Sequence, residues 1–141
     1  MTKPNAAIQI LTIRTSRRTE LQDITEKIEL AVRESHCSSG VCHLFVPHTT
    51  AGILINEGYD PDVARDMEAA FDRLIPDSPA FRHAEGNSDS HIKTALVGTS
   101  ETVWIENGRL SLGQWQRIFF AEFDGPRARQ LRLKIAPDSA V

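Results

Sequence analysis

The sequence predicts an α+β fold with an antiparallel β-sandwich core and two to three helices. Strand patterns open the chain, helical patterns dominate its middle, and hairpin-linked strands fill its last third. Such segregation favours an antiparallel sheet or sandwich over a doubly wound parallel fold. A chain of 141 residues without linker, repeat or low-complexity tract is typical of one domain, so we expect a single domain over residues 1–141.

Helical and strand patterns follow one another through the first half of the chain. Apolar residues at helical spacing predict an amphipathic helix over residues 20–35, with Thr19 as its N-cap. A second helix is expected to begin at Asp60, because the following proline suits a first helical turn, and to end before Pro76. Alternating or continuous apolar runs predict three strands, over residues 7–14, 41–48 and 52–58.

A short helix and several strands are expected in the second half. Residues 76–89 are polar and show no periodicity, which is typical of a functional or mobile loop. A helix follows, capped by Ser88 or Asp89, and we expect its apolar side to face the core through Ile92, Ala95 and Leu96. Strands are predicted over residues 101–108, 109–123 and 129–136, with a hairpin signal at Asn107–Gly108.

Composition and charge argue against several function classes. The chain is 40% hydrophobic and 25% charged, as ordinary globular proteins are. Its formal net charge is −3, whereas nucleic-acid binding requires a basic face, so we expect no nucleic-acid partner. No window approaches the roughly 18 apolar residues of a membrane span. The N-terminal run alternates as a strand does, and the spacing of Cys37 and Cys42 matches no zinc motif. We therefore expect a cytoplasmic protein without a membrane partner.

Histidines provide the first candidate chemistry. His48, His83 and His91 each lie at the boundary of a predicted element beside polar residues, whereas His36 and His43 have ordinary positions on a helix and a strand. Three imidazoles with an open position are the ligand set of a catalytic zinc or similar divalent ion. The spacing of the three is loose, so the residues alone leave open whether they converge.

Acidic and anion-binding candidates lie close to these histidines. Glu57 and Asp89 are candidate bases or metal-ligand neighbours, although either could be a solvated charge or a cap. The helix that starts after Asn87 could hold a phosphate on its free N–H groups. Arg127 and Arg129 follow a turn and could clamp the same anion, or could form surface ion pairs. No phosphate-binding loop and no nucleophile motif is present.

The run LGQWQRIFFAEFDGPR, residues 112–127, is the last unusual stretch. Trp115 between two glutamines could stack on a flat ring, or could be a core residue. Strand alternation places Glu122 and Asp124 on one face, and Phe119, Ala121 and Phe123 on the other, where we expect the core. The two acidic side chains could be solvated, or could line a subunit interface or a cleft.

Four stretches together resemble one family. In order, they are HTTAGILINEG, DPDVARDM, NSDSHIKTALVG and NGRLSLGQWQRIFFAEFDGPR. They resemble the YjbQ-like family, whose members are named secondary thiamine-phosphate synthases, and the match runs from about Ile8 to Ile135. Gln114 departs from the pattern, because a small residue or threonine is expected there.

The resemblance implies a fold, an assembly and a site. The implied assembly is a homotrimer with sheets packed around a threefold axis. The implied site uses His48, His83 and His91 for a divalent metal, zinc or alternatively magnesium. Its catalytic and substrate-binding residues, within one chain or across a subunit boundary, would be Glu57, Asp89 and Arg127, and Asn87, Trp115, Gln116 and Asp124.

Two functions remain open. The resemblance implies a metal-dependent enzyme acting on small phosphorylated compounds, with a side activity that joins a pyrimidine pyrophosphate to a thiazole phosphate. The alternative is a non-catalytic trimeric module that binds a small ligand and uses its histidines structurally.

Overall fold

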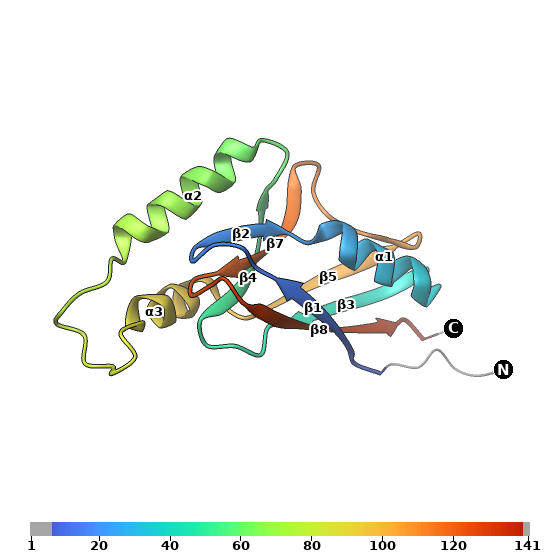
Figure 1. Cartoon of the computed structure of the whole chain (residues 1–141). Helices are drawn as coiled ribbons and strands as arrows, with labels where there is room; N and C mark the ends of the chain where they lie inside the picture. Colours follow the sequence, from blue (N-terminus) through green and yellow to red (C-terminus); the bar gives the residue numbers. More distant parts are fainter. Residues whose placement is uncertain (1–6, 140–141) are drawn as a thin grey trace.

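The structure is a computed structural model that describes residues 7–139. Residues 1–6 and 140–141 of the predicted domain lie outside the described residues. Within the described range the chain forms two antiparallel sheets and three helices (Figure 1), which confirms the α+β prediction. The helices are α1 (Thr25–Ser35), α2 (Pro61–Leu74) and α3 (Ser88–Val97).

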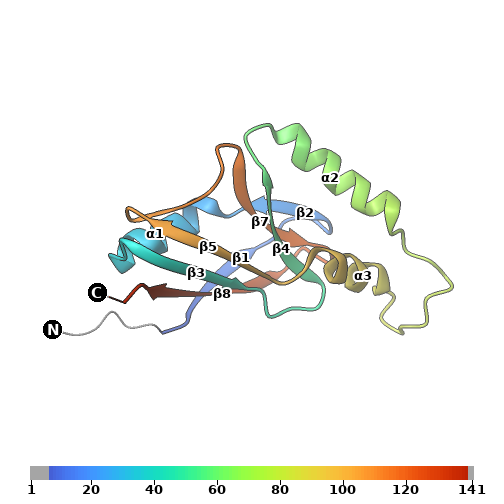
Figure 2. The same ribbon diagram turned by 180° about the vertical axis from the view of Figure 1, so that it is seen from behind.

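The two sheets are built from strands distant in sequence. The larger sheet contains β1 (Gln9–Arg14), β3 (Ser39–Phe45), β5 (Ser100–Glu106), β6 (Arg109–Leu110) and β8 (Ala128–Pro137), in the order β1-β8-β3-β5-β6. The smaller sheet contains β2 (Glu20–Asp23), β4 (Ala51–Glu57) and β7 (Gln116–Glu122), in the order β2-β7-β4. Figure 2 shows α2, α3 and their connecting loop at one end of the molecule, away from α1.

The main core lies between the larger sheet, the smaller sheet and α1. One face of α1 contributes Ile28, Ala31 and Val32, as its amphipathic pattern predicts. A second cluster packs under α2, where Phe119 and Phe123 are buried as expected. Because β7 supplies residues to both clusters, it is buried on both of its faces. Cys37 and Cys42 are buried free thiols.

The predicted helix over residues 20–35 is wrong in its first turn. Residues Glu20–Asp23 instead form β2, which pairs with β7, and Ile24 rather than Thr19 is the N-cap of α1. Pairing with a strand almost a hundred residues away overrides the local helical spacing. Likewise, the strand predicted over 109–123 is interrupted between β6 and β7. The Gly113 N–H donates to Gln116 Oε1 there, at 2.8 Å.

The prediction for the buried side of α3 is also wrong. The helix buries Asp89, Ser90, Lys93 and Thr94, whereas Leu96 is 68% exposed. These side chains form hydrogen bonds and ion pairs instead of packing as apolar groups: Ser90 Oγ donates to the Phe123 carbonyl, and Asp89 accepts from Arg18. Polar groups can be buried in this way because each finds a hydrogen-bond partner. The helix also begins without the predicted side-chain cap from Ser88 or Asp89, since Asn87 is its N-cap residue.

No helix among residues 7–139 combines the length and the apolar character that crossing a membrane requires.

Candidate functional site

A pocket of about 780 Å³ lies where the start of α3 meets the ends of β3, β7 and β8. The β3–β4 connection supplies His48 and Thr50, and the loop before α3 supplies His83 and Glu85. The turn between β7 and β8 supplies further charged groups. The pocket brings together seven residues that the sequence singles out: His48, His83, His91, Asn87, Asp124, Arg127 and Arg129.

His48 is held in a neutral form. Its Nε2 accepts the Gln130 backbone N–H at 2.9 Å, so the ring proton lies on Nδ1. Burial, together with the positive charge of Arg129, lowers the pKa of His48 below its usual range. This imidazole therefore offers a neutral donor to the pocket near neutral pH.

His83 and His91 lie against each other. Their ring centroids are 5.4 Å apart, and the rings meet edge to face at 84°. His83 Nε2 lies 3.9 Å from Glu85 Oε2, which is beyond normal hydrogen-bond distance. The loop and the helix thus deliver two neighbouring imidazoles to one wall.

The three histidines line one pocket but do not form one ligand set. Among residues 7–139, no group of three or more histidine, cysteine, aspartate or glutamate side chains lies close enough to hold a metal ion. The Nε2 lone pair of His48 is already used by Gln130. The predicted three-histidine centre therefore does not fit this arrangement of a single chain.

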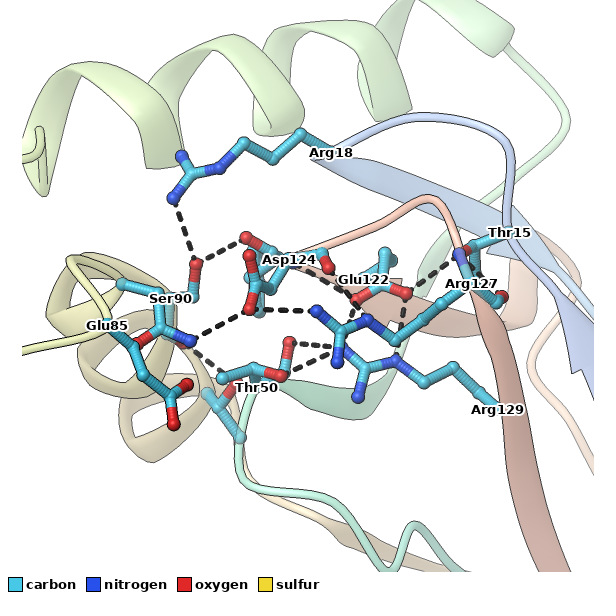
Figure 3. Close-up of polar contacts among 12 residues, drawn as sticks. Thr15, Arg18, Thr50, Glu85, Ser90, Glu122, Asp124, Arg127 and Arg129 are labelled. Atoms are coloured by element: carbon cyan, nitrogen blue, oxygen red, sulfur yellow. Dashed lines mark hydrogen bonds and ion pairs between the residues drawn. The ribbon is translucent and has the colours of Figure 1, made fainter.

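Arg127 and Asp124 contact each other beside the pocket (Figure 3), and Asn87, the N-cap residue of α3, extends this chain of polar contacts. Arg127 Nη2 donates to Asp124 Oδ2 at 3.1 Å, and its Nε donates to the Asp124 carbonyl at 3.0 Å. Asn87 Nδ2 donates to the same carboxylate at 2.8 Å. Asn87 Oδ1 is buried and has no hydrogen-bond partner among the described residues. The pocket therefore has the Arg127 guanidinium at its edge, and beside it a buried acceptor without a partner.

A buried ion pair lies beneath these residues. Arg129 Nε donates to Glu122 Oε1 at 2.9 Å, and its Nη2 also donates to Thr50 Oγ1 at 2.8 Å (Figure 3). Thr15 Oγ1 donates to Glu122 Oε1 at 2.7 Å. Burial alone would raise the pKa of Glu122, but the bonds from Arg129 and Thr15 outweigh it and lower that pKa. The pair fixes the floor of the pocket, because Arg129 itself lines it.

The sequence carried a signal for this pair. Arg129 has the same strand parity as Leu131 and Leu133, which face the core, so alternation predicts an inward arginine. Glu122 shares its parity with Ile118 and Phe120 in the same way. The expectation of a solvated or cleft-lining Glu122 is wrong, because that face of β7 belongs to the main core.

Asp89 does not line the pocket. It is almost fully buried, and it accepts two bonds from Arg18, at 3.0 and 3.2 Å. Burial raises its pKa, but the Arg18 bonds and the charge of Lys93 outweigh burial and lower it overall. Within one chain the Asp89 carboxylate faces Arg18 and Lys93 instead of the pocket, so its predicted catalytic role stays a prediction.

The structure does not bring Glu57, Trp115 and Gln116 to the pocket within one chain. In the antiparallel pair of β4 and β7, Glu57 lies opposite Gln116 at one end, whereas Ala51 lies opposite Glu122 at the end near the pocket. Six residues of strand separate the two ends by roughly 20 Å. The Glu57 carboxylate accepts a hydrogen bond from the backbone N–H of Tyr59, just after β4. Trp115 is exposed, and its ring centroid lies 5.8 Å from that of Tyr59. These residues occupy a different surface.

The sequence and the fold are both similar to known proteins. A family described as "UPF0047 protein YjbQ-like" matches residues 9–138. The UPF0047 protein of Methanocaldococcus jannaschii is 52% identical over 126 residues, which cover 89% of this chain and 91% of that protein. UPF0047 protein YugU of Bacillus subtilis is 47% identical over 129 residues, covering 91% and 98%.

Solved structures agree with this similarity. An uncharacterised conserved YjbQ/UPF0047 family protein from Clostridium acetobutylicum has a TM-score of 0.88 at 48% identity, covering 91% of this chain and 99% of that one. A YbjQ-like protein of unknown function from Sulfolobus solfataricus has a TM-score of 0.88 at 30% identity, covering 94% and 97%. The chain therefore belongs to the YjbQ-like UPF0047 family.

Proposed function

We propose that the pocket binds a small phosphorylated compound and that the chain is an enzyme acting on it. One observation carries this proposal: Arg127, three imidazoles and the start of α3 border the same pocket. Arg127 is half exposed, and its guanidinium has more donors than Asp124 uses. A phosphate oxygen can therefore bind this guanidinium without breaking its contact with the carboxylate.

Two further groups support a phosphorylated ligand with a polar body. The first turn of α3 lacks a side-chain cap, so its N–H groups retain capacity for an anion. The unused Asn87 Oδ1 suits a hydroxyl or amino donor on the same ligand, once the side chain shifts to expose it. The neutral His48 ring, which lines the same pocket, adds a donor.

The specific reaction that we propose joins a pyrimidine pyrophosphate to a thiazole phosphate with loss of pyrophosphate. Arg127 would bind the departing pyrophosphate and stabilise its developing charge. The neighbouring imidazoles of His83 and His91 would donate to its other oxygens. This activity can be a side reaction beside another phosphorylated substrate.

Isothermal titration with inorganic pyrophosphate tests the binding step. We expect the protein to bind pyrophosphate and Arg127→Gln to bind it at least tenfold more weakly, a loss of about 1.4 kcal/mol. Arg73→Gln, at the exposed end of α2, is the matched control and should leave affinity unchanged. Equal affinity in Arg127→Gln and the unmodified protein would contradict the proposed site.

A coupled assay then separates the enzyme from a binding module. Incubation with the pyrimidine pyrophosphate and the thiazole phosphate should release pyrophosphate, and His91→Gln should slow the release. Binding of pyrophosphate without turnover of this pair would instead favour the trimeric ligand-binding module over the proposed reaction.

The divalent metal, zinc or magnesium, is a separate proposal, since the imidazoles of one chain do not form its ligand set. Elemental analysis of untagged protein measures it directly. Stoichiometric metal that is lost in His91→Gln would support it, and metal-free protein that turns over substrate would contradict it.

We further propose a homotrimer and a cytoplasmic location. The outward face of the larger sheet supports self-association, because Ile10 and Phe45 lie beside Arg132 in one cross-strand row and are exposed. The buried free thiols of Cys37 and Cys42 are compatible with a reducing compartment.

A further inference from the structure

The buried side of α3 holds charges that the proposed function does not use. Lys93 is only 1% exposed, and its Nζ lies 2.9 Å from Asp72 Oδ1 and 3.5 Å from Asp89 Oδ2. Asp89 also binds Arg18, and Asp72 accepts a hydrogen bond from Thr19 at 2.8 Å. Two cations and two carboxylates thus form one neutral cluster, which we call the α3 anchor: Arg18, Asp72, Asp89 and Lys93.

The α3 anchor joins three separate segments of the chain. Asp72 lies in the last turn of α2, Lys93 and Asp89 lie on α3, and Arg18 lies in the connection between β1 and β2. Asp72 precedes the α2–α3 loop and Asp89 follows it, so Lys93 links both ends of that loop. Both His83 and Glu85, which line the pocket, come from this loop.

The α3 anchor lies on the side of α3 that faces away from the pocket. The opposite side of the same turns of α3 faces the pocket. Neither Lys93 nor Asp89 lines the pocket, whereas Asn87 and His91 do. Few apolar contacts hold α3 in place, because its buried side chains are polar. Its position beside the end of β7 then depends on directional bonds, among them the one from Ser90 Oγ to the carbonyl of Phe123, the residue after β7.

We infer that Lys93 is a positioning residue that acts through the α3 anchor, fixing α3 and the α2–α3 loop so that His91 and His83 meet at the pocket. Lys93 touches no ligand in this account. Its effect on ligand affinity rests on the proposed function, whereas its effect on the position of α3 does not.

Replacing the buried cation tests the inference. Lys93→Met keeps an unbranched side chain of similar length but leaves Asp72 and Asp89 with one uncompensated charge. We expect amide hydrogen exchange in the first turns of α3 to accelerate at least tenfold and the His91 ring resonances to shift. Exchange in β8 and the His43 resonances should remain unchanged. Lys27→Met, on the exposed side of α1, is the matched control.

Restoring neutrality separates positioning from packing. In Asp72→Asn/Lys93→Met the surplus charge is removed and the Arg18–Asp89 pair remains, so we expect His91 to regain much of its original environment. Asp72→Asn alone removes a half-exposed partner and provides a milder variant if Lys93→Met does not fold. Unchanged α3 exchange and unchanged His91 resonances in a folded Lys93→Met or Asp72→Asn protein would overturn the inference.

Pyrophosphate titration links the anchor to the pocket. We expect Lys93→Met to weaken pyrophosphate binding at least tenfold while the folded protein keeps its β-sheet exchange pattern. If the unmodified protein does not bind pyrophosphate, the proposed function fails, and the exchange and His91 measurements still decide the inference. If α3 loosens but affinity is unchanged, positioning of the pocket by Lys93 is wrong.

Discussion

The Glu122–Arg129 pair is the clearest example of how single residues define this site. A buried ion pair is costly to break, because removing one partner leaves an uncompensated charge in the interior. Every oxygen of Glu122 has a partner, from Arg129, Thr15 or the Asp124 backbone N–H. Glu122 and Thr50 therefore hold the Arg129 guanidinium at a defined place in the floor of the pocket.

Neutralising Glu122 should destabilise the fold. We expect Glu122→Gln to lower the free energy of unfolding by about 3–5 kcal/mol, because Arg129 loses its buried counter-charge. Urea unfolding at pH 7 measures this, and Glu34→Gln on exposed α1 is the control, with a change within about 0.5 kcal/mol. A loss below about 1 kcal/mol would contradict a structural role for the pair.

The same pair predicts a pH dependence. The pKa of Glu122 is lower in the folded chain than its unfolded value of about 4.3, so its stabilisation is complete above that value. It is lost as pH falls through the folded pKa. Unfolding measured from pH 6 to pH 3 should show the protein losing stability with acid, and the slope should be smaller in Glu122→Gln. Identical slopes in both proteins would contradict this assignment.

At the residue scale the sequence predicts much of the pocket. The family resemblance predicts one site for six residues, and all six line the pocket: His48, His83, His91, Asn87, Asp124 and Arg127. Arg129 is predicted as an anion clamp or a surface ion-pair residue, and strand alternation could have predicted its burial. Nothing local marks Lys93 as buried. Its burial depends on Asp72 and Arg18, which other elements supply.

At the scale of elements, α3 depends on a close approach to β4. The Ile53 N–H donates to the Gly98 carbonyl at 3.1 Å, directly after α3 ends. A Cβ on Gly52 would lie 2.3 Å from that carbonyl oxygen, so glycine is required for the backbones to meet. This contact fixes the C-terminal end of the helix while the α3 anchor fixes its beginning.

Gly52→Ala should therefore displace α3. We expect a loss of about 1–3 kcal/mol in the free energy of unfolding, because backbone instead of a flexible side chain must move. Gly113→Ala is the control, since the nearest atoms there belong to the flexible Gln116 side chain. Thermal unfolding of both variants compares them, and equal stability would argue against a tight α3–β4 contact.

Local patterns predict most elements but not those formed by distant pairing. The helix pattern of α1 and the strand patterns of β3, β4 and β8 agree with the structure. Local spacing predicts a helix over residues 20–23, which instead pair with β7. For α3 the helix itself is confirmed, but hydrophobic periodicity gives the wrong buried side, since ion pairs and hydrogen bonds replace apolar packing there.

At the scale of the whole molecule, the outward face of the larger sheet is the candidate trimer surface. Trp104 is 66% exposed and pairs across from Val41 on the same face. Exposed apolar groups that lie together on a protein surface are typical of contacts between subunits. If the chain assembles through this face, the assembly buries Trp104 and leaves the helices at the end of the molecule outside.

Trp104→Glu should dissociate the proposed trimer. Analytical ultracentrifugation should give three times the chain mass for the unmodified protein and a smaller species for the variant. Leu74→Glu, on exposed α2, should leave the mass unchanged. A monomeric unmodified protein would contradict the proposed homotrimer, and a trimeric Trp104→Glu protein would place the interface elsewhere.

The binding claim for the pocket is tested most directly by the imidazole resonances of the five histidines during titration with inorganic pyrophosphate. His48, His83 and His91 line the pocket, whereas His36 and His43 lie outside it and act as internal controls. Assignment follows from single His→Gln variants. We predict saturable shifts for the three pocket histidines and none for the other two. No shift at saturating pyrophosphate, or equal shifts for all five, would contradict a phosphate-binding pocket at the start of α3.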